Sequence, residues 1–262
     1  MDLDHIKRIA VAAAYEGGEV LRARFGKLTE IRKKGAIDLV TEADTASERA
    51  IIQTLRQAFP DHAVMAEESG ETAGDRDCLW IIDPLDGTTN FAHQVALFAV
   101  SIAFAHQGRL VAGVVLNPLS GELFNAVEGR GASLNGRQIR VSPVARLGDS
   151  LLVTGFPYNF ADSMPSMMGR FARCLKASQG VRRLGAAALD LCYVADGRFE
   201  AFWEENLHPW DTAAGVVIVR EAGGVVTDFS NRPFTPQYPE ILASNGRVHQ
   251  EMIAQLEQKE VA

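Results

Sequence analysis

The chain has 262 residues, of which 47% are hydrophobic and 23% are charged, and this balance argues against a disordered protein. The length fits one large domain or two closely packed halves. The net charge of −7 provides no basic surface of the kind that nucleic acid requires, so we expect no direct nucleic-acid partner.

The N-terminus and the apolar stretches predict a cytoplasmic protein with no membrane partner. The chain starts Met-Asp-Leu-Asp-His, without the basic and apolar regions of a secretory signal. No apolar stretch reaches the roughly 18 residues that a bilayer-spanning helix needs. Cys78, Cys174 and Cys192 are far apart, lack metal-ligand spacing and have apolar neighbours. This predicts three reduced cysteines in the core.

The first half of the chain, to about residue 145, is predicted to contain two helices and a sheet. Apolar residues recur at helical spacing over residues 3–25, and a second helix is expected to run to about Phe59. Thr41 is a candidate N-cap for this second helix, with Asp44 at the third helical position in a capping-box arrangement. The glycine-rich residues 129–136 predict a surface loop with a tight turn. The predicted strands, of which the last three form an antiparallel meander, are 29–33, 63–66, 79–82, 98–106, 109–117 and 122–127.

The second half, from about residue 146 to 262, is predicted to mix helices with short strands. The expected helices are 163–176, 186–195, 210–222 and 248–258. The expected strands are 151–154, 199–203, 225–229 and 241–244. No repeat, low-complexity tract or linker separates the halves. We therefore expect residues 1–262 to form a single domain in which the halves, about 1–145 and about 146–262, pack as one unit.

Residues 80–91, Trp-Ile-Ile-Asp-Pro-Leu-Asp-Gly-Thr-Thr-Asn-Phe, form the first candidate site. An apolar run ends at Asp83, and Asp86 follows three residues later. The small residues 87–90 could then open a helix with free backbone N–H groups. Two carboxylates at a strand end, beside an anion-accepting turn, suit a site where metal ions meet a phosphate. The same residues are common in simple turns, so this pattern alone leaves both interpretations open.

Two further acidic residues follow a predicted strand or begin a predicted helix. Glu67 follows the strand 63–66, and Asp211 begins the helix 210–222. Acidic residues at such positions can converge in space, and Mg²⁺ prefers oxygen ligands of this kind. The alternatives are a solvated turn for Glu67 and a helix N-terminal carboxylate for Asp211. Four such positions in one chain favour a metal site.

Two motifs, Asp83–Phe91 and Trp210–Gly215, closely resemble the signature pair of the inositol monophosphatase family. Residues 67–69 and 38–44 resemble that family's upstream motifs, in the same order. The resemblance runs from about Ile6 to Glu257. It implies a mixed α/β (α+β) fold, namely the five-layer αβαβα sandwich of the sugar-phosphatase type. It also implies a homodimer.

The activity that the resemblance implies is that of a Mg²⁺-dependent, Li⁺-sensitive inositol-1-monophosphatase. This phosphomonoesterase would hydrolyse myo-inositol monophosphate to inositol and phosphate by means of a metal-activated water. A metal-bound water loses its proton far more easily than bulk water, and a second ion offsets charge on the leaving oxygen. Phosphoryl transfer otherwise needs positioning and electrostatics more than covalent chemistry from the protein.

The resemblance implies two to three Mg²⁺ ions per active site. One ion would be held by Glu67, Asp83 and the backbone carbonyl of Leu85. A second would be held by Asp83, Asp86 and Asp211, with Asp83 as the bridge between the two ions. A third, weaker ion would be held by Glu67 and water molecules.

The catalytic residues that the resemblance implies are Glu67, Thr88 and Asp44. Thr88, oriented by Asp44, would help to position the attacking water, and Glu67 would assist the removal of its proton. The implied contacts to the substrate, a small phosphorylated polyol, are Asp86, Gly87, Thr88, Gly185, Ala186, Ala187 and Glu204. His93 and His208 lie near the motifs, and we interpret both as structural.

The exact substrate is left open by the sequence. Glu204 matches the position that contacts a ring hydroxyl in the family, although it could also be a solvated carboxylate. Ala186 stands where the animal enzymes carry a hydroxyl residue, which removes a possible substrate contact. The alternatives are a fructose-1,6-bisphosphatase or a histidinol-phosphate phosphatase. Arg182 and Arg183 could meet a second phosphate, or they could lie on the surface or at a dimer interface.

A function of another class is also open, because some bacterial relatives of this family bind the machinery of transcription or RNA processing. The chain could therefore be a moonlighting interaction protein. A protein that had abandoned catalysis would be expected to lose its metal-binding carboxylates. All four are intact here, which favours an enzyme.

Overall fold

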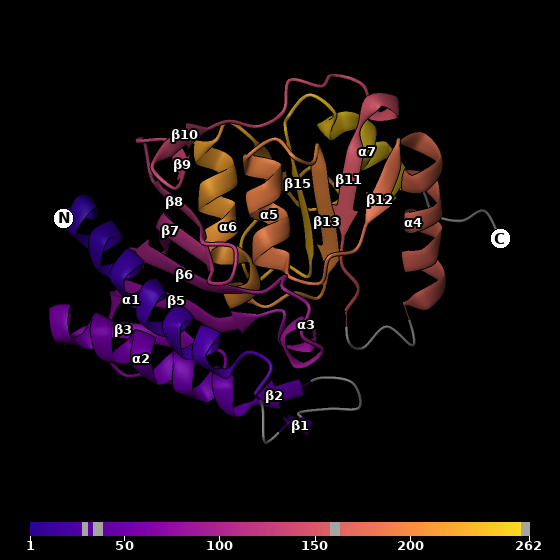
Figure 1. Ribbon diagram of the computed structural model, residues 1–262. Helices are drawn as coiled ribbons and strands as arrows, with labels where there is room; N and C mark the ends of the chain where they lie inside the picture. Colours follow the sequence, from indigo (N-terminus) through magenta and orange to yellow (C-terminus); the bar gives the residue numbers. More distant parts are fainter. Residues whose placement is uncertain (28–30, 34–38, 158–162, 258–262) are drawn as a thin grey trace.

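The computed structural model describes residues 1–27, 31–33, 39–157 and 163–257, and its strands form two large mixed sheets and one small two-stranded sheet (Figure 1). The helices are α1 (Leu3–Arg24), α2 (Glu42–Ala58), α3 (Thr88–Ala92), α4 (Met164–Ala177), α5 (Ala187–Ala195), α6 (Pro209–Glu221) and α7 (His249–Glu257). The strands of the first half are β1 (Ile31–Lys33), β2 (Leu39–Thr41), β3 (His62–Ala66), β4 (Gly70–Thr72), β5 (Asp75–Asp86), β6 (Ala99–His106), β7 (Arg109–Asn117), β8 (Glu122–Val127), β9 (Ala132–Leu134) and β10 (Arg137–Ile139). Those of the second half are β11 (Leu151–Thr154), β12 (Gly180–Arg182), β13 (Ala201–Glu205), β14 (Val225–Thr227) and β15 (Glu240–Ser244).

The elements stack in five layers, as the family resemblance implies. The larger sheet has the order β10-β9-β8-β7-β6-β5-β3-β4, with α1 and α2 on one face and α5 and α6 on the other (Figure 1). The smaller sheet, β12-β11-β13-β15-β14, lies beyond α5 and α6, and α4 and α7 form the last layer (Figure 1). The predicted mixed α/β fold is therefore confirmed.

The middle helices are buried because their sequences are apolar on all sides. Every residue of α5 is buried, and so are residues 212–219 of α6. A helix without a polar face is stable in water only when other elements enclose it, and here the two sheets do so. One apolar cluster includes Val115 from the larger sheet and Phe202 from the smaller one. Both halves of the sequence thus contribute to the same core.

The second helix begins where its predicted cap indicates. The hydroxyl Oγ1 of Thr41 accepts a hydrogen bond from the N–H of Ala43 at 3.1 Å, and the N–H of Thr41 donates to Asp44 Oδ2 at 2.8 Å. This reciprocal arrangement is a capping box. The prediction of buried cysteines is also confirmed, because all three are buried and free of disulfides.

Short strands account for most differences from the sequence-based prediction. Residues 129–136 were predicted as a loop, but β9 and β10 form a hairpin around the tight turn at Asn135 and Gly136, both at positive φ. The strands β4 and β12 were not predicted. Three residues are too few to show the alternation that identifies a strand. Residues 29 and 30 of the predicted first strand lie outside the described residues, as does residue 258 of the predicted last helix.

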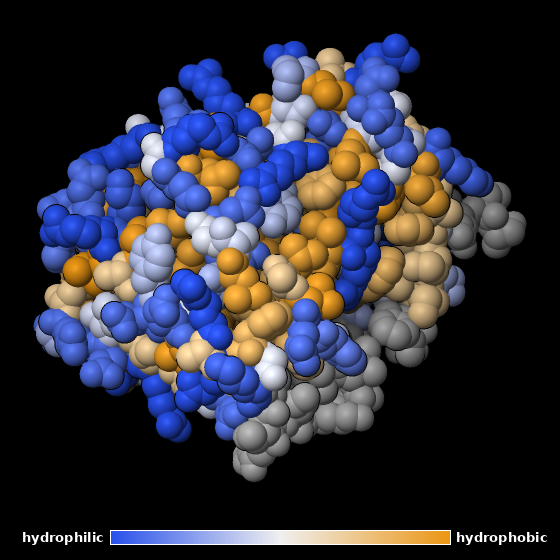
Figure 2. Space-filling view, in the orientation of Figure 1, coloured by the Kyte–Doolittle hydropathy of each residue, from blue (hydrophilic) through white to orange (hydrophobic). Residues whose placement is uncertain are grey.

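On the face shown in Figure 2, the hydropathy of the surface differs between the region over α1 and α2 and the region over α4. Polar residues dominate over α1 and α2, whereas apolar residues gather over α4 (Figure 2). The exposed apolar side chains of α4 are Met164, Met168 and Leu175. Within the described parts of the chain, no helix combines the length and the apolar character that crossing a membrane requires.

Candidate metal and phosphate site

The site is built around the end of β5, which lies between β3 and β6 in the larger sheet. The pairing of β5 with β6 shifts register between Asp83 and Asp86, so the strand is irregular where the two carboxylates stand. Gly87 follows as the N-cap of α3 with φ +90°. A Cβ at Gly87 would stand 3.0 Å from the carbonyl oxygen of Leu97. Both the backbone conformation and the close approach therefore require glycine here.

Glu67 and Asp211 reach the same region from other elements. Glu67 directly follows β3, which runs parallel to β5, and its N–H donates to the carbonyl oxygen of Ile82 at 3.2 Å. Asp211 lies in the first turn of α6, where its Oδ2 accepts a hydrogen bond from the N–H of His208 at 2.6 Å. The hydroxyl of Ser101 in β6 donates to the carbonyl oxygen of Trp210 at 3.3 Å, which fastens the start of α6 to the larger sheet.

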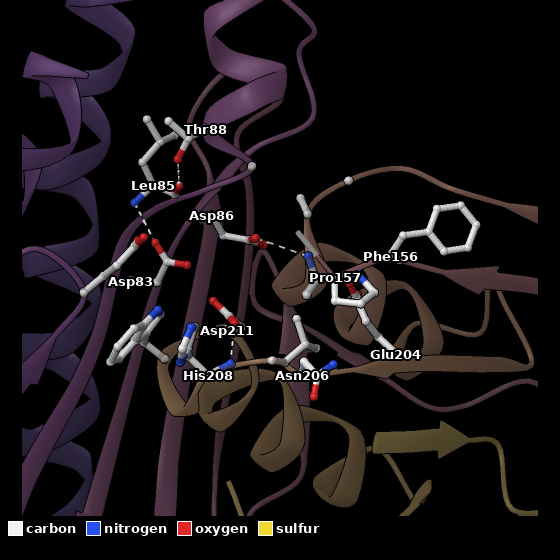
Figure 3. A pocket seen from close by; sticks show the side chains of 18 of the residues that line it. Asp83, Leu85, Asp86, Thr88, Phe156, Pro157, Glu204, Asn206, His208 and Asp211 are labelled. Atoms are coloured by element: carbon white, nitrogen blue, oxygen red, sulfur yellow. Dashed lines mark hydrogen bonds between the residues drawn. The ribbon is translucent and has the colours of Figure 1, made fainter. Parts of the chain in front are cut away.

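The predicted site residues lie together around a cavity of about 610 Å³. With the exception of Asp44, all of them line it: Glu67, Asp83, Leu85, Asp86, Gly87, Thr88, Gly185, Ala186, Ala187, Glu204 and Asp211. Asp83, Asp86 and Asp211 lie at one end, and Glu204 lies toward the other end beside Phe156 and Pro157 (Figure 3). The volume falls within the range of about 300–1,000 Å³ that is usual for small-molecule sites.

Backbone N–H groups hold each of the buried aspartates in place. The N–H of Leu85 donates to Asp83 Oδ1 at 2.9 Å. The N–H groups of Ala187 and Ala188, in the first turn of α5, donate to the two oxygens of Asp86 at 3.2 and 2.8 Å. The start of α5 therefore orients Asp86, besides lining the cavity (Figure 3).

Thr88 connects the cavity to α2. Its hydroxyl lies 3.1 Å from Asp44 Oδ1 and 3.0 Å from the carbonyl oxygen of Leu85, so it can donate to either. Asp44 Oδ2 accepts from both the N–H and the hydroxyl of Thr41. Burial raises the pKa of Asp44 to about 6, against the lowering effect of these hydrogen bonds. Asp44 thus lies behind the cavity wall, within hydrogen-bonding distance of Thr88.

The electrostatics at the β5 end are those of several buried acids that repel one another. Burial first, and then the charges of Glu67, Asp86 and Asp211, raise the pKa of Asp83 well above its usual value. Burial also raises the pKa of Asp86 to about 7, and it raises the pKa of Asp211. Among the described residues, no lysine or arginine forms an ion pair with Asp83, Asp86 or Asp211.

This donor set fits hard cations such as Mg²⁺. It consists of carboxylate oxygens with the carbonyl oxygen of Leu85 beside them, and such ligands suit Mg²⁺ better than zinc. A bound cation would also offset the repulsion that raises the pKa values. Over the described residues, however, no three acidic, histidine or cysteine side chains are already gathered closely enough to hold an ion. The carboxylates would therefore have to turn toward an ion when it binds.

Glu204 has an unusual environment for a carboxylate. It is 8% exposed, and burial raises its pKa to about 8 although the charge of Arg183 acts in the opposite direction. A Cβ at Gly155 would stand 2.1 Å from Glu204 Oε2, so Glu204 packs directly on the backbone of Gly155. The interpretation of Glu204 as a solvated carboxylate is therefore wrong.

Sequence reasoning missed part of the cavity wall. Gly155, Phe156 and Pro157 follow β11, and Asn206 and Leu207 follow β13. Because β11 and β13 are parallel, their carboxyl ends meet at one edge of the smaller sheet, where ligands commonly bind. Residues that directly follow the two predicted strands could therefore have been identified from the sequence as candidates for the cavity wall.

The two histidines near the motifs differ in location. His208 lines the cavity, and its ring stacks on that of Trp210 with 4.8 Å between centroids. His93 is exposed at the end of α3 and does not line the cavity.

Asp190 on α5 is a buried acid that the sequence analysis did not single out. It is 1% exposed, and neither of its carboxyl oxygens has a hydrogen-bond partner among the described residues. Burial, followed by the nearby charges of Glu204 and Asp86, raises the pKa of Asp190 well above its usual value. A buried carboxyl group without a partner is more stable in its neutral form.

Comparisons with known proteins agree with the fold. The model of the inositol monophosphatase family matches residues 2–262. A protein from Synechocystis sp. named inositol-1-monophosphatase is 46% identical, over 96% of this chain and 88% of its own. A Pseudomonas aeruginosa protein named Nus factor SuhB is 45% identical, over 95% of this chain and 94% of its own. The crystal structure of the extragenic suppressor protein suhB from Bartonella henselae superposes with a TM-score of 0.94 at 40% identity, covering 97% of this chain and 99% of that one.

We predict that Asp190→Asn stabilises the protein more at pH 8 than at pH 5, relative to wild type. The raised pKa of Asp190 means that the folded state keeps a proton that the unfolded state releases above about pH 4. Wild-type stability therefore falls as the pH rises toward the folded-state pKa, whereas asparagine does not titrate. Urea midpoints at both pH values, without added metal, measure this, and Asp61→Asn at an exposed position serves as the control. An equal gain at both pH values would contradict the prediction.

Proposed function

The chain belongs to the inositol monophosphatase family, and on this basis we propose that it is a Mg²⁺-dependent phosphatase that hydrolyses myo-inositol monophosphate to inositol and phosphate. One observation carries the proposal. Asp83, Asp86 and Asp211 are brought together from β5 and α6 at one end of the cavity, beside Thr88. One of the relatives described above is named inositol-1-monophosphatase and another is named Nus factor SuhB. Because their names differ, the substrate of this chain is part of our proposal.

The proposed metal ligands are those that the family resemblance implies. Glu67, Asp83 and the carbonyl of Leu85 would hold one Mg²⁺, and Asp83 would share a second with Asp86 and Asp211. A third ion would be held by Glu67 and water. Bound Mg²⁺ would ease the loss of a proton from the attacking water and offset the charge on the leaving oxygen.

The protein groups at this end of the cavity would orient the reacting atoms. With its hydrogen directed to Asp44 or to the Leu85 carbonyl, the Thr88 hydroxyl has lone pairs that can accept a hydrogen bond from water. Glu67 would accept the proton that this water releases. The backbone N–H groups of Gly87 and Thr88, at the start of α3, would bind oxygens of the phosphate.

The opposite end of the cavity would receive the polyol. Glu204 would hydrogen-bond a ring hydroxyl, and its raised pKa means that at neutral pH a protonated form able to donate is well populated. Residues 185–187 would contribute backbone contacts, because Ala186 has no polar side chain. A homodimer and a cytoplasmic location are also proposed, on the basis of the family resemblance.

We predict that hydrolysis of inositol 1-phosphate depends on Mg²⁺ and is inhibited by Li⁺. The carboxylates repel one another without a cation, so EDTA should abolish the activity and added Mg²⁺ should restore it. Release of inorganic phosphate measures both effects, and a zinc titration tests whether the ion is specific. Activity that persists in EDTA would exclude the metal mechanism, and full activity in Li⁺ would count against the second ion.

We predict that Asp83→Asn reduces the rate far more than Glu204→Gln. Asp83 would contact both ions, so we expect kcat to fall by at least about 100-fold, the scale of losing one electrostatic contact to a transition state. Glutamine preserves the shape of a Glu204 side chain that is partly neutral, so the expected rise in KM is about tenfold or less. Circular dichroism of both variants controls for folding. Similar losses in the two variants would remove the argument for a bridging role.

A second candidate function follows from the relatives named Nus factor SuhB. The chain could bind a partner in the machinery of transcription or RNA processing, in addition to or instead of catalysis. We predict that Asp211→Asn abolishes hydrolysis but leaves such binding intact, because Asp211 lies inside the cavity. A pull-down with wild type and variant in parallel tests this. Loss of both properties in a folded variant would mean that binding needs the intact site.

A further inference from the structure

A second cavity lies between α2 and the turn that joins β3 to β4. Its volume is about 710 Å³, within the range of about 300–1,000 Å³ that is usual for small-molecule sites. It is lined by one face of α2, from Thr45 to Gln57, and by Glu68, Ser69 and Thr72. We call it the α2 pocket. It shares no lining residue with the cavity at the end of β5.

The α2 side of the pocket is a row of mostly polar side chains. Its members recur at intervals of three and four residues, so they lie on one face of the helix. Ile51 and Leu55 belong to the buried face of α2 and do not line the pocket. From Thr45 to Gln57 the row extends for about 18 Å at the helical rise of about 1.5 Å per residue. The pocket is therefore long enough for a ligand with several functional groups.

Arg49 and Arg56 supply the positive charge of the pocket. They stand about two helical turns apart, so both lie on the lining face, with Gln53 between them. Both are exposed, and across the described residues neither forms an ion pair, a side-chain hydrogen bond or a contact with an aromatic ring. Arg22 on α1, in contrast, forms an ion pair with Glu19. The two guanidinium groups of the pocket can thus donate to a ligand.

Two carboxylates decide which kind of anion fits the pocket. Glu48 is 4% exposed, and its Oε2 accepts a hydrogen bond from the N–H of Glu68 at 2.9 Å. These carboxylates would repel a second anionic group placed beside them, but they can accept hydrogen bonds from hydroxyl groups. The hydroxyls of Thr45 and Ser69 can both donate and accept. A ligand with one anionic end and several hydroxyl groups therefore matches the lining better than a bare anion.

The α2 pocket adjoins the first cavity at two places in the chain. After β3, Glu67 lines the first cavity and Glu68 lines the α2 pocket. At the start of α2, Asp44 lies behind the wall of the first cavity and Thr45 lines the α2 pocket. A molecule in the α2 pocket would therefore contact the turn that carries Glu67.

We propose that the α2 pocket is a second ligand site, which binds a small sugar phosphate with its phosphate between Arg49 and Arg56 and its hydroxyl groups toward Glu68 and Ser69. A phosphate monoester carries roughly two negative charges at neutral pH, which two guanidinium groups balance. Guanidinium groups bind phosphate oxygens through paired, charge-assisted hydrogen bonds. The site needs no metal ion and shares no residue with the first cavity, so it does not depend on the proposed phosphatase function.

The test measures binding by isothermal titration calorimetry in EDTA, where the first cavity holds no cation to attract a phosphate. The probes are glucose 6-phosphate, fructose 6-phosphate and ribose 5-phosphate, and glucose and inorganic phosphate serve as comparisons. The double variant Arg49→Gln/Arg56→Gln removes both guanidinium groups of the pocket. The matched control Arg8→Gln/Arg22→Gln removes two positive charges from exposed positions on α1. Circular dichroism verifies that both double variants fold.

We expect at least one sugar phosphate to bind the wild type more tightly than glucose or inorganic phosphate does. Its Kd should rise about tenfold or more in Arg49→Gln/Arg56→Gln, the effect of losing charge-assisted contacts, and should change less than about twofold in the control. Hydrogen exchange should show that the bound probe protects residues 67–72 of the wild type.

Four results would overturn the proposal. None of the three sugar phosphates binds, or glucose or inorganic phosphate binds as tightly as they do. Arg49→Gln/Arg56→Gln binds the probe as the wild type does, or no more weakly than the control. The fourth is protection from hydrogen exchange that is confined to residues 83–92, which would place the probe in the first cavity.

Discussion

Repulsion between buried carboxylates is the constraint on which the rest of the site depends. Burial raises the pKa values of Asp83, Asp86 and Asp211, and the charges of neighbouring carboxylates, Glu67 among them in each case, raise them further. A chain can bear this cost only if other interactions hold the groups in place. Here each aspartate accepts at least one backbone N–H, from Leu85, from the start of α5 or from His208. Backbone donors add no side-chain entropy cost, and few substitutions can remove them. A cation bound as proposed would offset the repulsion between these carboxylates, and metal binding would then stabilise the folded state.

The same groups connect elements that are far apart in the sequence. Asp86 accepts from α5 a hundred residues later, and Asn90 contacts the segment that precedes α5. The hydroxyl of Ser101 holds the start of α6. The cavity therefore lies at the junction of the larger sheet with α5 and α6, and its walls come from both halves of the chain. Its shape depends on how these elements pack as well as on the signature motifs.

Much of this arrangement could be predicted from the sequence, and the exceptions have physical reasons. Long periodic segments such as α1 and the meander β6-β7-β8 were predicted closely, because their apolar spacing is unambiguous. Four acidic site residues were found because each follows a predicted strand or begins a predicted helix, namely Glu67, Asp83, Asp86 and Asp211. The site roles of Asp44 and Glu204 came from the family resemblance. The hairpin of β9 and β10 was missed because each strand has only three residues and glycines lie before the first strand and in the turn. Asp190 was missed because a single acid in an apolar helix carries no pattern, and its lack of a partner is visible only in three dimensions. That Arg183 lines the cavity whereas Arg182 does not is likewise visible only in three dimensions.

Asp44 contributes both to the N-terminal cap of α2 and to the surroundings of Thr88. One carboxylate oxygen completes the capping box that starts α2, and the other lies within hydrogen-bonding distance of the Thr88 hydroxyl. A substitution at Asp44 would therefore lower the fraction of folded protein and the competence of each folded molecule together. A rate measured per milligram of such a variant would combine the two effects. Only a rate normalised to the concentration of folded sites would report what the contact with Thr88 contributes. An evolutionary change of Asp44 would have both effects too, because this carboxylate cannot be altered for catalysis without altering the helix that it caps.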